Sequence, residues 1–575
     1  MLRVCSIAGL LLVACIGVAP VSSAQDMRAP RIVATETDWK AVSDTLYGHE
    51  RPTDTAKALA GLNDLTNAIY PAIAASPVPV LLPFDTSDLL RDKAEGNAAR
   101  TAIDYATVFK RPDFFQAGSG GYDAAYTIHT RDNPELGVQF SERVVIQISG
   151  SSLLYELGEP SGLTGMPVNG LESEFPGIRR LMLENVIRYT FVRFGVPYVV
   201  AIECYEATRF RKISCRSTDK SATRFLKALQ VAGGLPTYQP VQVTPTTIER
   251  PDAISADFKY HAPGDLIPGS GTKGNAGHVD YTVYSKIRFP IANGPAFANS
   301  QSFMNWGDCD QTGRVGLGRQ GNTTAYRCRV NNLPLVGDEG ANGNYAYPWR
   351  DNFCEHRSFF VGECPAGLGH QGQDIRPGSC KQRSAGASRC EPYQHDVVAV
   401  RDGLVLRAPG QSSLHIVVNA PGERLRFRYL HMLPQQLDRN EVIHGHTVRE
   451  GEVIGQVGNY LKRENATTYH LHFDIQVPTR YGWVFVNPYV TLVSAYERLI
   501  GGRGHEVKDP PNDDFRAEIK PVAAPHAGVQ QLSSASAPDA ANPVQSGVQS
   551  DANDRIAAEK TQDETTLSKQ SKSEQ

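Results

Sequence analysis

One stretch in the last third of the chain specifies a local structure and a chemistry together. In Tyr469–Val477 apolar and polar residues alternate, which predicts a β-strand. Successive side chains of a strand point to opposite faces, so His470 and His472 share one face while Leu471 and Phe473 pack on the other. Two imidazoles on one face can reach the same metal environment, and one can bind the metal while the other faces a substrate.

A second motif lies about a hundred residues earlier. His370 and Asp374 are four positions apart, and Gly372 and Pro377 disfavour a regular helix, so we expect both side chains at a strand end and turn. A third histidine, His431, lies between the two motifs. Histidine and aspartate are zinc ligands, and three protein ligands with an open fourth position make a catalytic site. The sequence therefore predicts a zinc hydrolase.

Other histidines have a simpler interpretation. His444 and His446 also flank a single residue, but that residue is Gly445 and a turn-and-strand pattern follows, which favours an exposed turn. His395 and His415 are expected to be ordinary polar residues of a β-domain. No HExxH motif is present in the sequence, so a glutamate base at that motif is excluded.

The same motifs carry a resemblance to a known family. They are His370-x-Gly372-x-Asp374-Ile375, Tyr429-x-His431, Gly455–Asn459, His470-Leu471-His472-Phe473 and Val486-Asn487-Pro488. In this order the chain resembles the LytM/lysostaphin-type zinc endopeptidases over residues 285–499. The resemblance implies that His370, Asp374 and His472 bind one Zn²⁺ and that His431 and His470 are catalytic. All five positions are filled, which favours an active enzyme, although the stretch from Cys309 to Cys390 is longer than the compact family core.

The expected function is zinc-dependent hydrolysis of the peptide cross-links of bacterial peptidoglycan by a metal-activated water, with stem peptides or cross-links as the substrate. Two alternatives stay open. One is a non-catalytic regulator of cell-wall amidases, for which a cell-wall hydrolase would be the partner. The other is a periplasmic protease of exported proteins. A formal net charge of −3 argues against nucleic acid as a partner.

The first residues predict export. A short basic start, an apolar run over Val4–Val18 and small residues up to Ala24 form a secretory signal at residues 1–24. Lipoprotein anchoring at Cys15 is the alternative, but the apolar run continues beyond it. No other segment reaches the ~18 apolar residues of a membrane span. We therefore expect a periplasmic protein with no span in the mature chain.

The cysteines agree with export. Two of the ten lie in the signal, and an even number remains, without any CxxC metal motif. Such a count in an exported chain predicts disulfides. The simplest scheme pairs neighbours, with the connectivity left open: 204–215, 309–328, 354–364 and 380–390.

The length of 575 residues predicts two or more domains. Residues 25–260 read as an α+β region of unknown role, largely helical to about residue 115. In this region we expect short strands at Glu142–Gly150 and Val196–Ile202, with a helix over Ile178–Phe194 between them. The prolines of Pro77–Pro83 exclude an inner strand, and Gly118–Gly121 is expected to be a flexible turn.

The rest of the chain divides into three segments. Residues 261–284 form a linker, and residues 285–499 form an all-β antiparallel catalytic domain in which short strands alternate with Gly and Pro turns. Residues 509–575 are poor in large apolar side chains and are expected to be a disordered tail.

Overall fold

A computed structural model describes two folded parts of the chain, called here the N-terminal part and the C-terminal part. In the N-terminal part the described residues are 27–48, 54–97, 100–129, 134–138, 140, 143–157, 165–183, 186–204 and 215–236. In the C-terminal part they are 280–298, 308–316, 322–330, 333–334, 349, 351–353, 370–378, 392–467 and 469–501. The predicted signal, most of the predicted linker and the predicted tail lie outside these residues, so those three predictions stay predictions.

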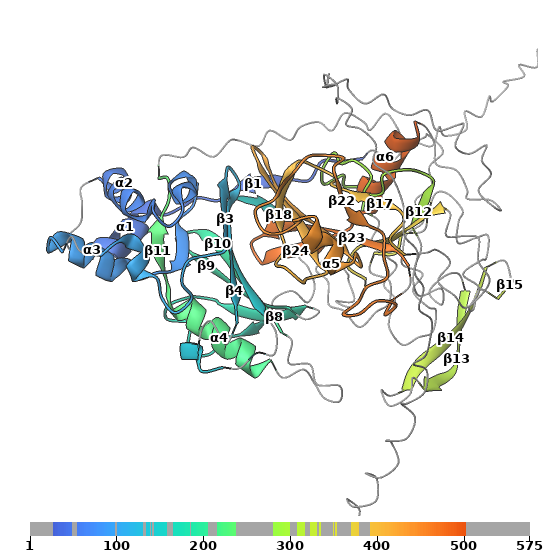
Figure 1. Cartoon of the computed structure of the whole chain (residues 1–575), viewed down its shortest axis with the longest axis horizontal. Coiled ribbons are helices and arrows are strands. Elements are labelled where there is room, and N and C mark those ends of the chain that lie inside the picture. Colours follow the sequence, from blue (N-terminus) through green and yellow to red (C-terminus); the bar gives the residue numbers. More distant parts are fainter. Residues whose placement is uncertain are drawn as a thin grey trace, which may run out of the picture. The chain divides into compact units, whose positions relative to one another are not determined.

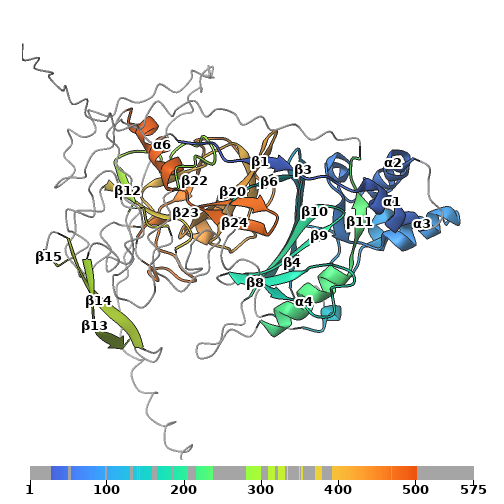
Figure 2. The ribbon, with the colours of Figure 1, turned by 180° about the vertical axis from the view of Figure 1, so that it is seen from behind.

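A seven-stranded antiparallel sheet forms the centre of the N-terminal part. Its strands, in spatial order, are β3 (Phe114–Gly118), β4 (Gly121–Ile128), β5 (Val144–Ser151), β10 (Val196–Glu203), β9 (Val186–Arg193), β8 (Arg179–Leu183) and β7 (Met166–Pro167). Helix α4 (Arg216–Lys227) lies across one face of this sheet, as both views show (Figures 1 and 2). Phe225 and Leu226 of α4 are fully buried against that face, which is therefore the core of the N-terminal part.

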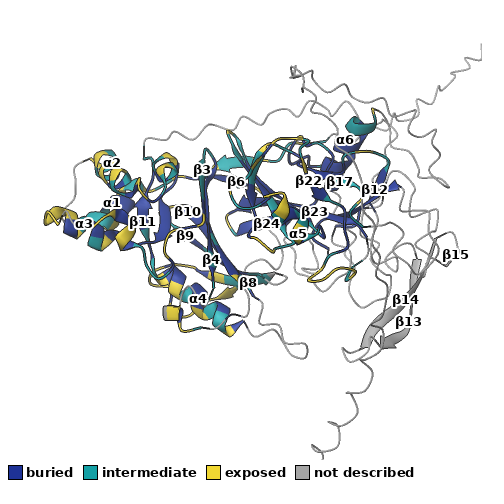
Figure 3. Cartoon of the chain, viewed as in Figure 1, coloured by how far each residue is buried: buried dark blue, intermediate teal, exposed yellow. Residues whose placement is uncertain are grey.

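Three further helices lie beside a two-stranded sheet. They are α1 (Trp39–Tyr47), α2 (Thr55–Thr66) and α3 (Thr86–Ala94), and the sheet pairs β2 (Val80–Pro83) with β11 (Leu229–Gly233). The three helices begin after Asp38, Asp54 and Asp85, whose side chains each accept a hydrogen bond from a first-turn backbone amide. Such a cap stabilises a helix by about 1 kcal/mol. The exposed surface of these helices is their outer side (Figure 3).

The remaining elements of the N-terminal part are short. They are β1 (Ile32–Ala34), β6 (Leu153–Tyr155) and the 3-10 turns η1 (Pro71–Ala75), η2 (Ala102–Tyr105) and η3 (Pro134–Leu136). Strand β1 pairs with β6. The helical interpretation of residues 25–115 thus holds for three segments, with β1 before α1 and β2 between α2 and α3. Strand β2 has β11 as its hydrogen-bonded neighbour within the described residues, in agreement with its prolines.

The helix expected over Ile178–Phe194 is wrong. The segment forms the antiparallel hairpin β8–β9, with Arg180 opposite Tyr189. In β9, Ile187, Tyr189 and Phe191 are buried at every second position. These residues are β-branched or aromatic and favour strands. The apolar positions fit both a helical and an alternating period, and packing against α4 and β10 selects the strand.

The C-terminal part contains an eight-stranded antiparallel sheet. Seven strands follow in the order β12 (Ala296–Ala298), β16 (Gln373–Pro377), β23 (Leu471–Thr479), β20 (Glu423–Leu430), β19 (Leu414–Ala420), β18 (Gly403–Leu406) and β21 (Thr447–Val448). The eighth, β24 (Gly482–Val486), pairs with β23. Strands β17 (Asp396–Val398) and β22 (Val453–Gln456) form a separate pair. The predicted antiparallel architecture is confirmed.

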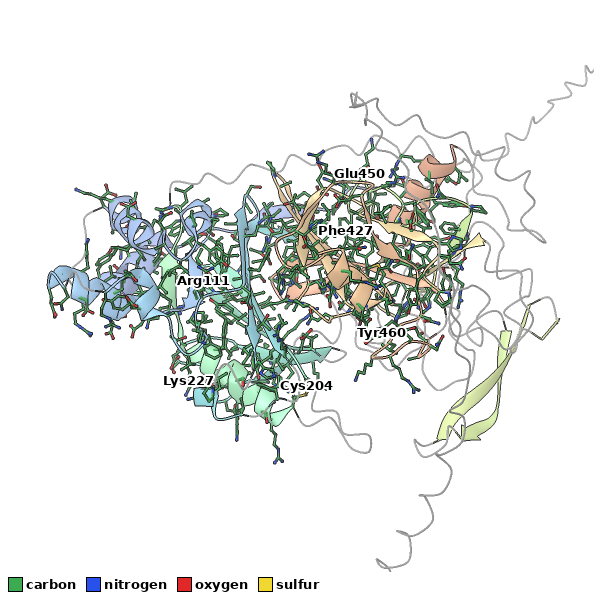
Figure 4. All side chains as sticks on the ribbon, in the orientation of Figure 1. Arg111, Cys204, Lys227, Phe427, Glu450 and Tyr460 are labelled. Carbon is green, nitrogen blue, oxygen red and sulfur yellow. A yellow bond between two sulfur atoms is a disulfide. The ribbon has the colours of Figure 1, made fainter. Side chains whose placement is uncertain are left out.

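Two helices add to the predicted all-β domain. They are α5 (Pro434–Arg439) and α6 (Tyr489–Ile500). Val490, Val493 and Tyr496 of α6 are fully buried in the core of the C-terminal part. Phe427, labelled in Figure 4, lies in the same core on the apolar face of the sheet. The helix ends at Gly501 in the left-handed conformation, where a side chain would be strained. Within the described residues, no helix is long and apolar enough to cross a membrane.

One disulfide is present among the described cysteines. Cys204 and Cys215 are bonded, with their Cα atoms 5.7 Å apart, beside the start of α4 (Figure 4). Cys309 and Cys328 lie opposite each other in the register of β13 (Asp308–Gly316) and β14 (Asn322–Val330), the latter continuing to β15 (Leu333–Pro334). The other predicted pairs, 354–364 and 380–390, lie outside the described residues.

The N-terminal and C-terminal sheets pack against each other. Along β4 and β5 one set of alternate residues faces the N-terminal core, and the other set faces the C-terminal sheet. The indole of Trp483 donates a hydrogen bond to Ser149 Oγ at 2.9 Å, and the guanidinium of Arg424 donates one to Ser151 Oγ at 3.1 Å. A small apolar cluster also contains residues of both parts: Phe114, Ala125, Val145, Leu406, Ala408 and Val417. Along β4 and β5, both faces of the N-terminal sheet are therefore buried.

Candidate metal centre and active site

Three neighbouring strands bring the predicted site residues together. Strand β23 lies between β16 and β20, and the register places Asp374 opposite His472. His370 lies just before β16, and His470 lies just before β23. His431 follows the last residue of β20. The predicted positions at strand ends therefore agree with the structure, and all five side chains meet at one end of the sheet.

His370, Asp374 and His472 lie at the distances that a shared metal ion needs. Nε2 of His370 is 2.9 Å from Nδ1 of His472 and 3.1 Å from Oδ1 of Asp374. Nδ1 of His472 is 3.3 Å from the same oxygen. A tetrahedral zinc ion with bonds of 2.0–2.1 Å places its ligand atoms about 3.3 Å apart. The three atoms thus form one face of such a tetrahedron, and the three residues are at most 3% exposed.

Hydrogen bonds on the far side of each imidazole fix which nitrogen faces the centre. Nδ1 of His370 lies 2.8 Å from the backbone carbonyl of Asn352, which only accepts, so this nitrogen carries the proton. In the same way, Nε2 of His472 donates to Oδ2 of Asp474 at 3.2 Å. The nitrogens that point inward are left with lone pairs. Two nitrogen lone pairs and a carboxylate oxygen therefore face one another and would repel without a cation or proton between them. The donor set fits zinc.

Local charges fix Asp474 as the acceptor and, without a cation, favour a proton at the inward face of His472. Burial raises the pKa of Asp474, but the adjacent Arg428 guanidinium and the His472 hydrogen bond outweigh burial and hold that pKa below its usual value. Burial lowers the pKa of His472, yet the bonds to Asp374 and Asp474 outweigh it and leave the pKa raised. Asp474 is thus an ionised carboxylate that accepts a hydrogen bond from Nε2–H of His472.

His431 and His470 form a second pair beside this trio. Their ring centroids are 4.5 Å apart, and Nε2 of His470 lies 3.4 Å from Oδ1 of Asp374. Nδ1 of His431 lies 2.9 Å from the carbonyl of Tyr460, so Nδ1 donates and Nε2 is left with its lone pair. Tyr460 belongs to the loop at the edge of the C-terminal part (Figure 4). Burial holds the pKa of His470 well below its usual value, so this imidazole is neutral near pH 7.

His431 has an uncommon backbone conformation. Its φ is +75°, in the left-handed region that residues other than glycine rarely adopt. The position directly after β20 turns the chain, so the side chain lies over the end of β23 rather than continuing the alternation of β20. Local strain of this kind persists where surrounding contacts hold it, and it gathers at functional sites.

The competing histidine pair lies elsewhere. His444 and His446 lie in the predicted turn, between α5 and β21, but both are only partly exposed rather than exposed. The backbone amide of Arg407 donates to Nδ1 of His444 at 3.1 Å. Nε2 of His446 lies 3.2 Å from a carboxylate oxygen of Glu452. Each imidazole thus has one local partner and lies away from the candidate metal centre.

Sequence reasoning missed the residues that hold the ligands in place. Asp474 was within reach, because it lies two positions after His472 on the same face of a strand. Arg428 lies opposite Asp474 on β20, and its second nitrogen donates to Gln371, next to His370. Asn352 has no local signal, since it lies 18 residues before His370 and only the fold brings it close.

Comparison with known proteins gives a family match in the C-terminal part. Residues 383–488 match the family model of peptidase family M23. The C-terminal part of the chain carries a domain of this family. His431, His470 and His472 lie inside the match, whereas His370 and Asp374 precede it. No curated protein matches the chain.

One similar solved structure comes from Ruminococcus gnavus and is provisionally described as a glycyl-glycine endopeptidase lytM. The sequences are 25% identical over 22% of this chain and 46% of that chain, with a TM-score of 0.17. The match thus spans less than half of the R. gnavus protein. Peptide hydrolysis is the activity that the M23 family supports for the C-terminal part.

Proposed function

We propose that the C-terminal part is a zinc endopeptidase that hydrolyses peptide cross-links of bacterial peptidoglycan. One observation carries the proposal. Three inward-facing acceptor atoms of His370, Asp374 and His472 lie 2.9–3.3 Å apart, with His431 and His470 directly beside them. This arrangement combines the ligands of a hydrolytic metal with two imidazoles of the kind that transfer protons in catalysis.

Zinc held by the trio would lower the pKa of water toward about 7 and polarise a carbonyl group. His470 is neutral because burial lowers its pKa, so its imidazole can take a proton from an attacking water. His431 is held by Tyr460 in the tautomer whose Nε2 accepts, and that nitrogen can orient the same water. Either imidazole, once protonated, can deliver a proton to the leaving amine of a peptide bond.

The substrate assignment has two supports. The motifs resemble the LytM/lysostaphin-type endopeptidases, and the first 24 residues have the pattern of a secretory signal, which would deliver the enzyme to the cell wall through the periplasm. Amino-terminal sequencing of the protein recovered from the cell envelope tests export: a mature chain that begins near Gln25 is expected, whereas a retained signal would contradict it.

The central experiment is mass spectrometry of peptidoglycan fragments after incubation with the mature protein. Zinc-loaded protein is expected to release new fragments whose masses correspond to addition of one water across a peptide bond. A chelator should abolish them, and so should His470→Ala and His472→Ala. His446→Ala alters a histidine in the remote turn and serves as the matched control, with full release expected.

Metal content separates the two roles. His470→Ala is expected to retain one zinc per chain, and His472→Ala is expected to retain none. Casein incubated in parallel distinguishes a general protease, because a cross-link endopeptidase should leave it intact. Zinc-loaded wild-type protein that releases no fragments from peptidoglycan would overturn the proposed function.

A further inference from the structure

The face of the C-terminal sheet that carries the metal ligands continues as a row of polar side chains. On β23, His472, Asp474 and Gln476 follow one another at every second position and are at most 3% exposed. The intervening residues point to the opposite face and fill the apolar core. The N-terminal sheet covers the far end of the polar row, so residues of the two parts meet on the face that holds the candidate metal centre.

These side chains form one continuous hydrogen-bonded chain. His472 Nε2 donates to Asp474 Oδ2 at 3.2 Å, and Gln476 Nε2 donates to Asp474 Oδ1 at 3.2 Å. The next donor is Arg188 of β9, whose Nη2 donates to Gln476 Oε1 at 3.3 Å. The chain therefore runs from a zinc ligand, through two buried residues, into the N-terminal part.

Arg188 is held in place by further contacts with the hairpin β23–β24. Its Nη1 donates to the backbone carbonyl of Trp483 at 2.7 Å. The guanidinium carbon also lies 5.3 Å from the centre of the Phe485 ring, while Arg428 contacts the same ring at 4.9 Å. Two arginines thus hold one aromatic ring, one from each part of the molecule.

The hydrogen bond from Arg188 helps to fix the orientation of the Gln476 side-chain amide. A guanidinium only donates hydrogen bonds, so Oε1 of Gln476 must face Arg188 and the amide nitrogen must face Asp474. Without Arg188 the amide oxygen loses its donor, and the contact with Asp474 alone holds the amide in this direction. A reversed amide would place its oxygen against the Asp474 carboxylate, two acceptors in contact, and would withdraw a donor from the group that orients His472.

We propose that Arg188 is a positioning residue for the candidate zinc centre, acting on His472 through Gln476 and Asp474. The inference rests on the proposed function only in assuming that His472 binds zinc. A carboxylate bonded to the far nitrogen of a zinc-binding histidine fixes its tautomer and raises its basicity, and loss of such a partner costs 10–100-fold in metal affinity. The N-terminal part thereby contributes to the metal centre although it supplies no ligand.

The test measures metal affinity in the full mature chain, independently of turnover. Arg188→Met keeps the aliphatic stem and removes both hydrogen bonds, whereas Asp474→Asn alters the link closest to His472. The matched control is Asn419→Ala, which also removes two hydrogen bonds between the parts, from Gly120 N at 2.8 Å and to Gly121 O at 2.9 Å. Asn419 lies at the far end of β19, opposite Arg424 rather than Arg428, the arginine that contacts Asp474.

Zinc affinity by chelator competition and the visible absorption of the Co²⁺-loaded protein are the two readouts. Asp474→Asn is expected to weaken affinity about 10–100-fold. Arg188→Met should weaken it about 3–10-fold, since it acts two bonds further away, and should shift the Co²⁺ spectrum in the same direction. Asn419→Ala should leave both within twofold of wild type. Combining Arg188→Met with Asp474→Asn should cost less than the product of the two losses.

Unchanged zinc affinity and an unchanged Co²⁺ spectrum in Arg188→Met would overturn the inference. An equal loss in Asn419→Ala would also overturn it, because the effect would then be one of docking in general. Arg188→Lys provides the check on folding: a shorter donor that still reaches Gln476 should restore part of the affinity. If these affinities behave as expected while peptidoglycan stays intact, only the proposed function fails; if peptidoglycan is cut but Arg188→Met binds zinc normally, only this inference fails.

Discussion

Two clusters of buried charge lie on the same face of the C-terminal sheet and differ in their balance of donors and acceptors. At one end, His370, Asp374 and His472 direct three acceptor atoms at one another. At the other end, Asp123 of β4 lies between two guanidinium groups, 3.2 Å from Arg424 and 2.5 Å from Arg426. All of these residues are nearly or fully buried.

This difference indicates that the histidine cluster is a ligand-binding site and that the Asp123 cluster has a structural role. The Asp123 cluster sets one carboxylate against two guanidinium groups, so it has a surplus of donors and its carboxylate already faces two cations. The ring of Trp483 completes it, with Arg426 4.1 Å from the ring centre. The histidine cluster has a surplus of acceptors, which a bound cation would balance. A surplus of lone pairs in a buried cluster is therefore the more informative signal of function.

The sharpest way to test the comparison is to remove the carboxylate at the histidine end. Asp374→Ala deletes one of three zinc ligands, so zinc affinity is expected to fall at least about 1,000-fold, equivalent to roughly 4 kcal/mol. Equilibrium dialysis against buffered zinc measures this loss. The chelated variant should unfold with a free energy close to that of chelated wild type, and a metal affinity that stays within tenfold would contradict the ligand assignment.

Removal of the carboxylate from the Asp123 cluster should lower the stability of the fold. Asp123→Ala leaves two buried guanidinium groups without their carboxylate, which is expected to lower the free energy of unfolding by about 3–5 kcal/mol. Denaturant titration of the zinc-loaded and the chelated protein measures it. The loss should be the same in both, because Asp123 has no part in metal binding. A destabilisation below about 1 kcal/mol would show that the cluster does not hold the two sheets together.

Removal of the metal should affect only the histidine end. Zinc present at 100–1,000 times its dissociation constant is expected to stabilise the fold by about 3–4 kcal/mol, because the folded chain alone assembles the three ligands. Thermal unfolding with and without chelator gives the difference. Asp374→Ala is the matched control, since its melting temperature should be insensitive to chelator; equal chelator effects on the variant and wild type would refute the assignment.

The smallest expected effect is a loss of folding stability at acidic pH. Burial lowers the pKa of His444 to about 4, with Asp113 opposing this shift and Arg407 adding to it, and the imidazole lies against Phe114 of the N-terminal part. The unfolded chain binds this proton below its ordinary pKa of about 6.5, so stability is complete above that pH and declines as the pH falls toward 4. By pH 5 the loss is at most about 2 kcal/mol.

Unfolding titrations at pH 7 and pH 5 test this slope. His444→Gln is expected to remove that part of the loss, so its stability should depend less on pH than that of wild type. His446→Gln makes the same change two residues away in the same turn and should keep the wild-type slope. Identical pH dependence in all three proteins would show that His444 does not contribute.

Four of the five candidate site residues lie in two short motifs of local geometry, whereas His431 and the roles of the set came from the family resemblance. The alternation of Tyr469–Val477 places two histidines on one face, and the four-residue spacing of His370 and Asp374 spans a turn into a strand. The β8–β9 hairpin was mistaken for a helix because its apolar residues satisfy both periods, and only contacts with α4 and β10 decide between them. Local pattern carries no information of that kind.

The contacts between the two sheets lay beyond any sequence pattern. Arg188 and Gln476 are 288 residues apart, and neither belongs to a motif. The turn at Gly118–Gly121 was interpreted as merely flexible, yet a Cβ at Gly118 would lie 2.7 Å from the carbonyl oxygen of Asn419. Glycine there allows the close approach of the second sheet. Such a requirement becomes visible only when the neighbouring backbone is known.

The covered polar row has a practical consequence for anyone who trims this enzyme to its catalytic portion. A fragment that starts near residue 280 would leave Arg424, Arg426 and Trp483 in contact with water, although the folded chain buries all three. In such a fragment Arg424 and Arg426 would lack their counter-ion Asp123, and the indole of Trp483 would add exposed apolar surface. It would be prone to precipitation, and its poor activity would misrepresent the intact molecule.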